Sequence, residues 1–167
     1  MNQFGSWIAN SALNDFALSL LANVPGLPPV LQTIHLLSIA AIMASAVMFN
    51  LRALGLAVPS QNLVEMATRL RAWAYWAVLT AFCSGVLFVL ARPGRYFDNP
   101  VFQIKFALLL PAVVFSDCLF RLTLNRASFW LRFKWQARLA ALLSLLLWIG
   151  VVLAGRWIAY SEYLFWP

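Results

Sequence analysis

Long apolar stretches alternate with short polar segments along the chain. Four of these stretches are about twenty residues or longer, the length of helix that crosses a hydrocarbon core of about 30 Å at about 1.5 Å per residue. Short connections between them favour antiparallel packing of consecutive helices. The pattern predicts an all-α integral membrane protein, a four-helix transmembrane bundle with helices over about residues 30–51, 70–91, 101–124 and 135–158.

The segment before the first apolar stretch has a different pattern. Over residues 6–22, apolar side chains recur at roughly helical spacing, with Asn10, Asn14 and Asp15 between them. Such a segment is too polar to span a membrane and predicts an N-terminal amphipathic helix at its surface. The prolines over 25–29 end it. With no other change of composition, residues 1–167 are expected to form a single membrane domain.

Composition agrees with the apolar pattern. The chain is 63% hydrophobic and 10% charged, with a mean hydropathy of +0.82, whereas soluble domains carry about 25% charged residues. The net charge of +7 comes mostly from Arg and Lys beside the apolar stretches, where they set topology and meet lipid phosphates. We therefore expect the lipid bilayer as a partner and no nucleic acid.

The loop charges predict the orientation. Arg52, Arg69 and Arg71 lie near the first connection, and the third connection is richer still in Arg and Lys. Since Arg and Lys concentrate in cytoplasmic loops, these two connections are expected in the cytoplasm. Both termini are then periplasmic, in a bacterial inner (cytoplasmic) membrane.

Polar residues gather near the periplasmic ends of the predicted helices. His35 is the only histidine, and it could ligate the iron of a haem or a copper ion, or hydrogen-bond a quinone carbonyl; the alternative is a packed imidazole bonded to a backbone carbonyl. Lys105 either extends to the interface or contacts an anionic group. The candidate cofactor-binding residues are His35, Lys105, Arg156, Arg95, Tyr160 and Gln32, with His35 the metal ligand if haem or copper binds.

Asp117 lies in the cytoplasmic half of the third predicted helix. A lone carboxylate there is costly, and Arg121, four residues later, is the obvious partner, with Arg52 of the first helix another candidate. We expect a structural ion pair among Asp117, Arg121 and Arg52. The alternative is that Asp117 takes part in a proton relay.

Three stretches resemble a known bacterial group. They are LQTIHLLSIAAIMASAVMFNLRALGLA in the first helix, Asn99-Pro100-x-Phe102-x-Ile104-Lys105 opening the third, and AGRWIAY closing the fourth. Together they are similar to the four-helix membrane family known as domain of unknown function 6644, over roughly residues 25–160. Asn50 stands where that family usually has an acidic residue, and VVFSDCLF lacks its late histidine. More distantly, the chain resembles the copper-resistance D-like and HemJ-like membrane proteins, which implies copper or haem at the helix histidine.

Three functions follow in order of expectation. The first is a small integral membrane subunit or accessory protein, packed in a larger, redox-associated complex or a homo-oligomer, since no nucleophile elbow, metalloprotease motif or phosphate loop is present and an enzyme is the less expected class. The second is a haem b or quinone site near the outer leaflet. The third is a small metal-ion transporter, although four helices provide little basis for alternating access.

Overall fold

The computed structural model describes residues 3–126 and 128–160, and the chain is 88% helical. No strand occurs in the described residues. In chain order the elements are α1 (Gln3–Ala9), α2 (Ala12–Asn23), α3 (Leu27–Leu54), α4 (Leu63–Ala91), α5 (Pro93–Phe97), α6 (Pro100–Asn125), α7 (Phe129–Arg132), α8 (Lys134–Trp157) and the 3-10 helix η1 (Ile158–Tyr160).

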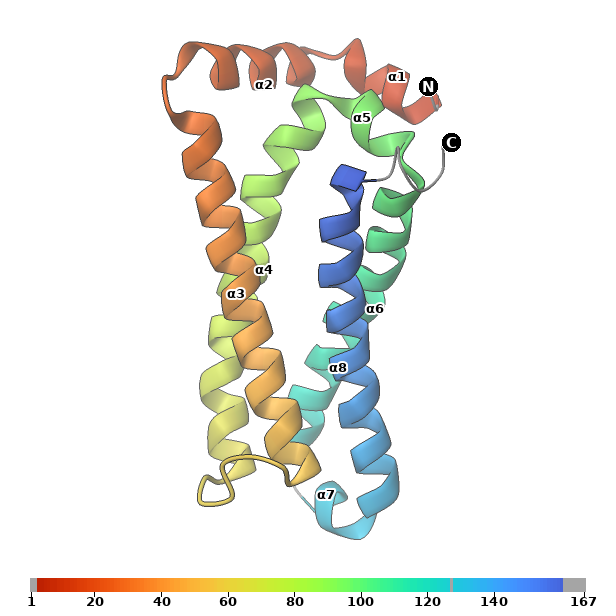
Figure 1. Ribbon diagram of the computed structural model, residues 1–167. Helices are drawn as coiled ribbons and strands as arrows, with labels where there is room; N and C mark the ends of the chain where they lie inside the picture. Colours follow the sequence, from red (N-terminus) through yellow and green to blue (C-terminus); the bar gives the residue numbers. More distant parts are fainter. Residues whose placement is uncertain (1–2, 127, 161–167) are drawn as a thin grey trace.

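The long helices α3, α4, α6 and α8 run side by side (Figure 1). Helices α1 and α2 lie across one end of this bundle, next to α5, and we call it the α2 end; the opposite end, with α7 and the 55–62 linker, is the α7 end. The most extensive packing is between α3 and α4, followed by α6 with α8 and α3 with α8. The bundle is therefore two antiparallel pairs joined mainly through α3 and α8.

Two boundaries differ from the sequence-based prediction. The amphipathic segment 6–22 is divided, because α1 ends at Ala9 and α2 begins only after Ser11, whose backbone is extended. Helix α4 begins at Leu63, well before residue 70, because the Asn62 side chain caps it by accepting a hydrogen bond of 2.8 Å from Val64 N. Local capping thus extends the second helix beyond its apolar stretch.

Glycine and proline fix the two ends of α3. Gly26 has a φ of 78° and leads into prolines in the first turn. At the other end Gly55, with a φ of 79°, donates to Arg52 O at 3.0 Å, and Leu56 N donates to Leu51 O at 2.9 Å. This Schellman arrangement satisfies carbonyls that the helix end leaves open and needs the left-handed backbone that glycine adopts readily.

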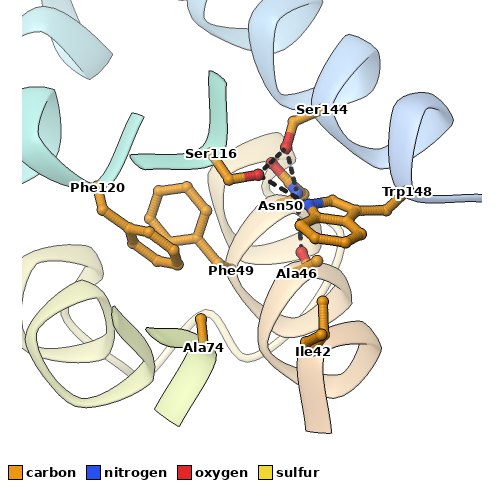
Figure 2. A pocket seen from close by; sticks show the side chains of 9 residues that line it. All are labelled: Ile42, Ala46, Phe49, Asn50, Ala74, Ser116, Phe120, Ser144 and Trp148. Carbon is orange, nitrogen blue, oxygen red and sulfur yellow. Dashed lines mark hydrogen bonds between the residues drawn. The ribbon is translucent and has the colours of Figure 1, made fainter. Parts of the chain in front are cut away.

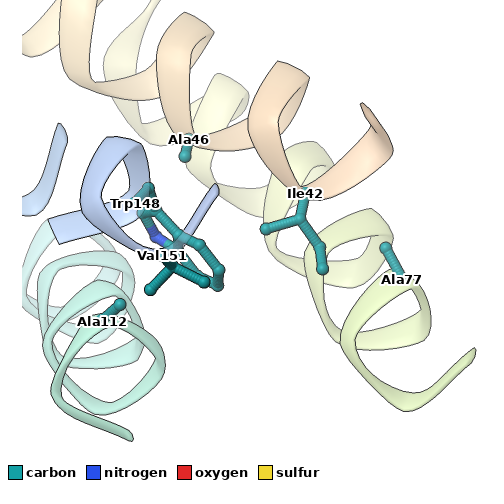
Figure 3. Close-up of a cluster of buried hydrophobic side chains, with 6 residues drawn as sticks. All are labelled: Ile42, Ala46, Ala77, Ala112, Trp148 and Val151. Atoms are coloured by element: carbon teal, nitrogen blue, oxygen red, sulfur yellow. The ribbon is translucent and has the colours of Figure 1, made fainter. Parts of the chain in front are cut away.

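The interior of the bundle holds two apolar clusters. The first is at mid-height, where Trp148 of α8 packs among small and branched side chains of all four long helices (Figure 3). The second, nearer the α7 end, is built around Phe49 and Phe120, whose ring centroids are 4.7 Å apart. Alanines at the contacts let the backbones approach closely, as membrane helices require.

The outer surface is as apolar as the interior. Large side chains such as Trp76, Phe82 and Leu110 are about two-thirds exposed on the helix flanks, where a soluble protein would place polar groups. Four helices in the described part of the chain are long and apolar enough to cross a membrane. The chain is therefore a multi-pass membrane protein with its apolar flanks facing lipid.

Helix α2 is attached to the end of α4. Asn14 is buried and donates from Nδ2 to Leu90 O at 2.6 Å and to Ala91 O at 3.3 Å, the last carbonyls of α4. Ala17 is fully buried one turn later, while Leu13 and Phe16 are more than half exposed. One face of α2 thus closes the bundle, and the other presents apolar side chains outward.

Candidate functional site

The His35 side chain is held between α3 and α4. Its Nδ1 lies 2.9 Å from Ala81 O and 3.0 Å from Ser84 Oγ. The Ser84 hydroxyl donates to Thr80 O at 2.8 Å, so its oxygen accepts from His35. Gly85 lies against the ring, since a Cβ added there would be 3.0 Å from His35 Cε1. Two small residues of α4 therefore make the socket for the imidazole.

These contacts determine which ring nitrogen carries the proton. A backbone carbonyl can only accept, so the Nδ1 facing Ala81 must carry hydrogen. In the neutral ring, Nε2 then keeps a free lone pair. No residue of the described ranges hydrogen-bonds Nε2. It is also accessible, because the one fully buried side-chain polar atom without a partner in those ranges is Asn50 Oδ1. The imidazole is thus fixed through Nδ1 and has no partner at Nε2 among the described residues.

Lys105 of α6 is the charged neighbour of this imidazole. Its stem lies along α8, where a Cβ added to Gly155 would be 3.6 Å from Cε and 3.7 Å from Nζ, and its ammonium is close enough to influence the charge of His35 without a hydrogen bond to it. Within residues 3–126 and 128–160, no carboxylate or other acceptor pairs with Lys105. A partly buried, uncompensated cation in a membrane span favours an anionic ligand.

The other four predicted cofactor residues are less closely associated with His35. Gln32, one turn before His35, is exposed. Arg95 is an exposed residue of α5. Arg156 and Tyr160 contact each other, with Arg156 Nη2 3.4 Å from Tyr160 Oη and its guanidinium 5.5 Å from the ring centroid. His35 and Lys105 therefore lie on α3 and α6 with no hydrogen bond between them, and the other four residues lie on the surface near the same end.

Asp117 forms its contacts with α4 as well as within α6. Arg121 Nε lies 2.6 Å from Asp117 Oδ2, Arg71 Nη2 lies 3.4 Å from Oδ1, and Tyr75 donates a short hydrogen bond to the same carboxylate. Arg52 is engaged elsewhere, donating to Gln61 O at 2.8 Å and to Pro59 O at 3.4 Å. The expected link from Asp117 to Arg52 is absent because Arg52 closes the 55–62 linker instead.

A second polar group occupies the interior towards the α7 end. Asn50 of α3, Ser116 of α6 and two residues of α8, Ser144 and Trp148, form a buried chain of hydrogen bonds (Figure 2). In the described ranges, no three His, Cys, Asp or Glu side chains gather where they could hold a metal ion. Any metal at His35 would therefore have to bring its own further ligands, as haem does.

Comparison with protein families shows which family the chain belongs to. A model for a family of unknown function, DUF6644, matches residues 27–161, which span α3 to the end of the described chain. The chain belongs to this family. The match confirms the resemblance inferred from the helix motifs; it does not extend to the copper-resistance D-like and HemJ-like proteins. No curated protein and no solved structure matches the chain.

In this DUF6644 member, several contact residues were not expected from the sequence. Ser84 and Gly85 are recognisable as a small pair that permits close helix packing, but nothing in the sequence assigns that pair to His35. Arg71 and Tyr75 resemble an interfacial anchor rather than partners of Asp117. The spacing of four between Arg71 and Tyr75 is the available signal, since it puts both on one face of α4.

Proposed function

We propose that this chain is a haem b-binding membrane protein, with the haem at the α2 end of the bundle. His35 Nε2 would be the iron ligand, and Lys105 would contact a propionate. The observation that carries the proposal is the hydrogen bond from His35 Nδ1 to Ala81 O at 2.9 Å. Histidines that bind metals typically donate their other ring nitrogen to a carbonyl or carboxylate, which fixes the ring and increases the basicity of the ligating nitrogen.

The same geometry favours haem over an oxidised quinone. A quinone offers carbonyl oxygens, which only accept, and a neutral His35 with its proton on Nδ1 has no donor left at Nε2. A metal centre needs the lone pair that Nε2 keeps. Lys105 supports the proposal further, because a haem propionate would supply the negative charge that its ammonium lacks among the described residues.

The number of histidines available to the iron determines which kind of haem chemistry is possible. The chain has one histidine, so a second histidine on the iron cannot come from the same protomer. Haem bound this way supplies one-electron redox chemistry or an open coordination position. Ala81 and Ser84 orient the imidazole, and Lys105 would balance the charge of a haem propionate.

The visible spectrum of the purified protein tests the proposal. After reconstitution with hemin in detergent, we expect a Soret band corresponding to one haem per protomer, lost in His35→Ala. Ser38→Ala is the matched control, since Ser38 lies one turn deeper on α3 and hydrogen-bonds Thr80 Oγ1 at 2.8 Å but does not hydrogen-bond His35. Lys105→Met should weaken haem binding by about tenfold. Equal Soret bands in the wild type and His35→Ala would contradict the proposal.

A quinone remains the second candidate ligand for His35 and Lys105. The accessible Nε2 could accept a hydrogen bond from the hydroxyl of a reduced quinol, with Lys105 donating to the other oxygen. Extraction of the purified protein and chromatography of the organic phase would distinguish the two. A stoichiometric quinone lost in His35→Ala, in a protein that takes up no hemin, would favour the quinone.

A further inference from the structure

A small cavity lies in the interior towards the α7 end. It measures about 20 Å³ and is bounded by Asn50 of α3, Ser116 of α6, and Ser144 and Trp148 of α8, with Ala74 of α4 as part of its wall (Figure 2). Apolar rings of Phe49 and Phe120 close another side. Most of the lining is apolar, so the few polar side chains in the cavity wall need an account of every donor and acceptor they present.

The side-chain oxygen of Asn50 has no hydrogen-bond donor among the described residues. Its side-chain nitrogen donates to Ala46 O at 2.8 Å and to Ser144 Oγ at 3.1 Å, which fixes the amide orientation. The residue is 1% exposed, and Oδ1 has no hydrogen-bond partner. A buried carbonyl oxygen without a donor is strongly unfavourable, and in native structures such groups are usually bonded to ordered water.

One of the two hydroxyl hydrogens of Ser116 and Ser144 has no acceptor within the described ranges. Trp148 Nε1 donates to Ser116 Oγ at 2.8 Å, and the two serine hydroxyl oxygens are 3.3 Å apart. One hydroxyl hydrogen makes the bond between the serines. The other has no acceptor in the described part of the chain. The cavity therefore offers one free acceptor and one free donor.

We propose that this cavity binds one water molecule, which donates to Asn50 Oδ1 and accepts from the spare serine hydroxyl. A water needs about 10–15 Å³ and two to four polar partners, and the cavity meets both conditions. Its volume of about 20 Å³ excludes larger ligands. No charged side chain lines it, so a neutral molecule fits better than an ion. The site is independent of the haem proposal, because it lies on other residues, nearer the opposite end of the bundle.

A substitution that fills the cavity tests whether it holds water, through the change in the midpoint of thermal unfolding. Ala74→Val adds two methyl groups to the cavity wall. If the cavity is hydrated, the methyls displace the water, leave Asn50 Oδ1 without a donor, and lower the midpoint of thermal unfolding in detergent by about 2–4 °C. A raised midpoint would show that the methyls had filled empty space; a lowered midpoint can also come from overpacking, so the NMR measurement below decides whether the cavity is hydrated. Ala72→Val, at an exposed position of the same helix, controls for the effect of valine on α4.

Water-edited solid-state NMR of the wild type in bilayers provides a readout that does not depend on a variant folding. We expect magnetisation from water to reach the Asn50 side-chain amide quickly. The reference is the backbone amide of Ala112, a fully buried residue of α6 that does not line the cavity. The proposal is overturned if magnetisation from water reaches the Asn50 side-chain amide no faster than the Ala112 backbone amide. It is also overturned if Ala74→Val has a higher thermal midpoint than Ala72→Val.

Discussion

Gly85 determines how closely the His35 ring can approach α4. A methyl group at residue 85 would lie 3.0 Å from Cε1 and 3.4 Å from Nδ1 of His35, so Gly85→Ala should push the ring away from Ala81 O. Because alanine favours helix more than glycine does, a loss of function here would not reflect helix propensity. We expect hemin affinity to fall by about tenfold, as it does when partners of a metal ligand are disturbed.

The ¹⁵N spectrum of the imidazole checks this prediction without haem. His35 is the only histidine, so its two ring nitrogens are assigned at once, and Gly85→Ala should shift the tautomer away from Nδ1–H. Gly155→Ala is the matched control, because its methyl would make ordinary contacts of 3.6 Å or more with Lys105. An unchanged ring spectrum in Gly85→Ala would show that the socket tolerates the methyl.

The Asp117 cluster is expected to link α6 to α4. Asp117 is 23% exposed and contacts Arg71, Tyr75 and Arg121. Asp117→Asn removes the charge that holds two guanidiniums together and should lower the thermal midpoint by about 2–4 °C.

The pair Glu65–Arg69 provides the comparison for this substitution. Its atoms are also 2.6 Å apart, but its side chains are 60% and 75% exposed, and exposed pairs contribute little. Glu65→Gln should therefore change the midpoint by less than about 1 °C. Similar shifts in the two variants would argue that the Asp117 cluster is a surface pair without a structural role.

At the scale of elements, Asn14 is expected to hold α2 on the bundle. Asn14→Ala removes both hydrogen bonds to the last carbonyls of α4 and should increase amide hydrogen exchange across Ala12–Asn23 by about 30-fold, since each bond contributes about 1 kcal/mol. Asn10→Ala, at an exposed position between α1 and α2, is the control. Exchange that is equally slow in both variants would place the attachment of α2 in Ala17 and its apolar neighbours.

Local patterns predict the elements of this fold far better than the contacts between them. The four apolar stretches identify α3, α4, α6 and α8, and the spacing of four residues predicts that Arg121 can reach Asp117. Contacts such as His35 with Ser84, or Asp117 with Arg71, depend on how each helix is rotated about its axis. Apolar side chains cover every face of these helices, so the sequence carries no amphipathic stripe to reveal that rotation.

At the scale of the whole molecule, the orientation in the membrane remains a prediction. Positive charge in the α7-end loops predicts that this end faces the cytoplasm and that the His35 site lies on the opposite side. With Cys83 and Cys118, both exposed, changed to alanine, single cysteines at Arg92 and Ser128 can be labelled from outside intact cells. We expect a membrane-impermeant maleimide to label Arg92→Cys and to spare Ser128→Cys. The reverse pattern would move the His35 site to the cytoplasmic side.

Association with another membrane protein, or with a second copy of the chain, is the remaining expectation at this scale. Native mass spectrometry of the protein released from nanodiscs should show whether it leaves the membrane alone, as a homo-oligomer or with a fixed partner. A monomer with one haem would make the subunit hypothesis unnecessary.

The bond between Asn50 and Ser144 joins residues 94 positions apart, and this separation bears on how the protein is made. At about 5–20 residues per second, the ribosome needs about 5–20 s to produce α8 after α3. Throughout that interval the Asn50 side-chain nitrogen can donate to Ala46 O but not yet to Ser144. We therefore expect a chain truncated before Ser144 to be degraded faster in the membrane than the full chain, because one donor of the buried Asn50 amide then lacks its acceptor.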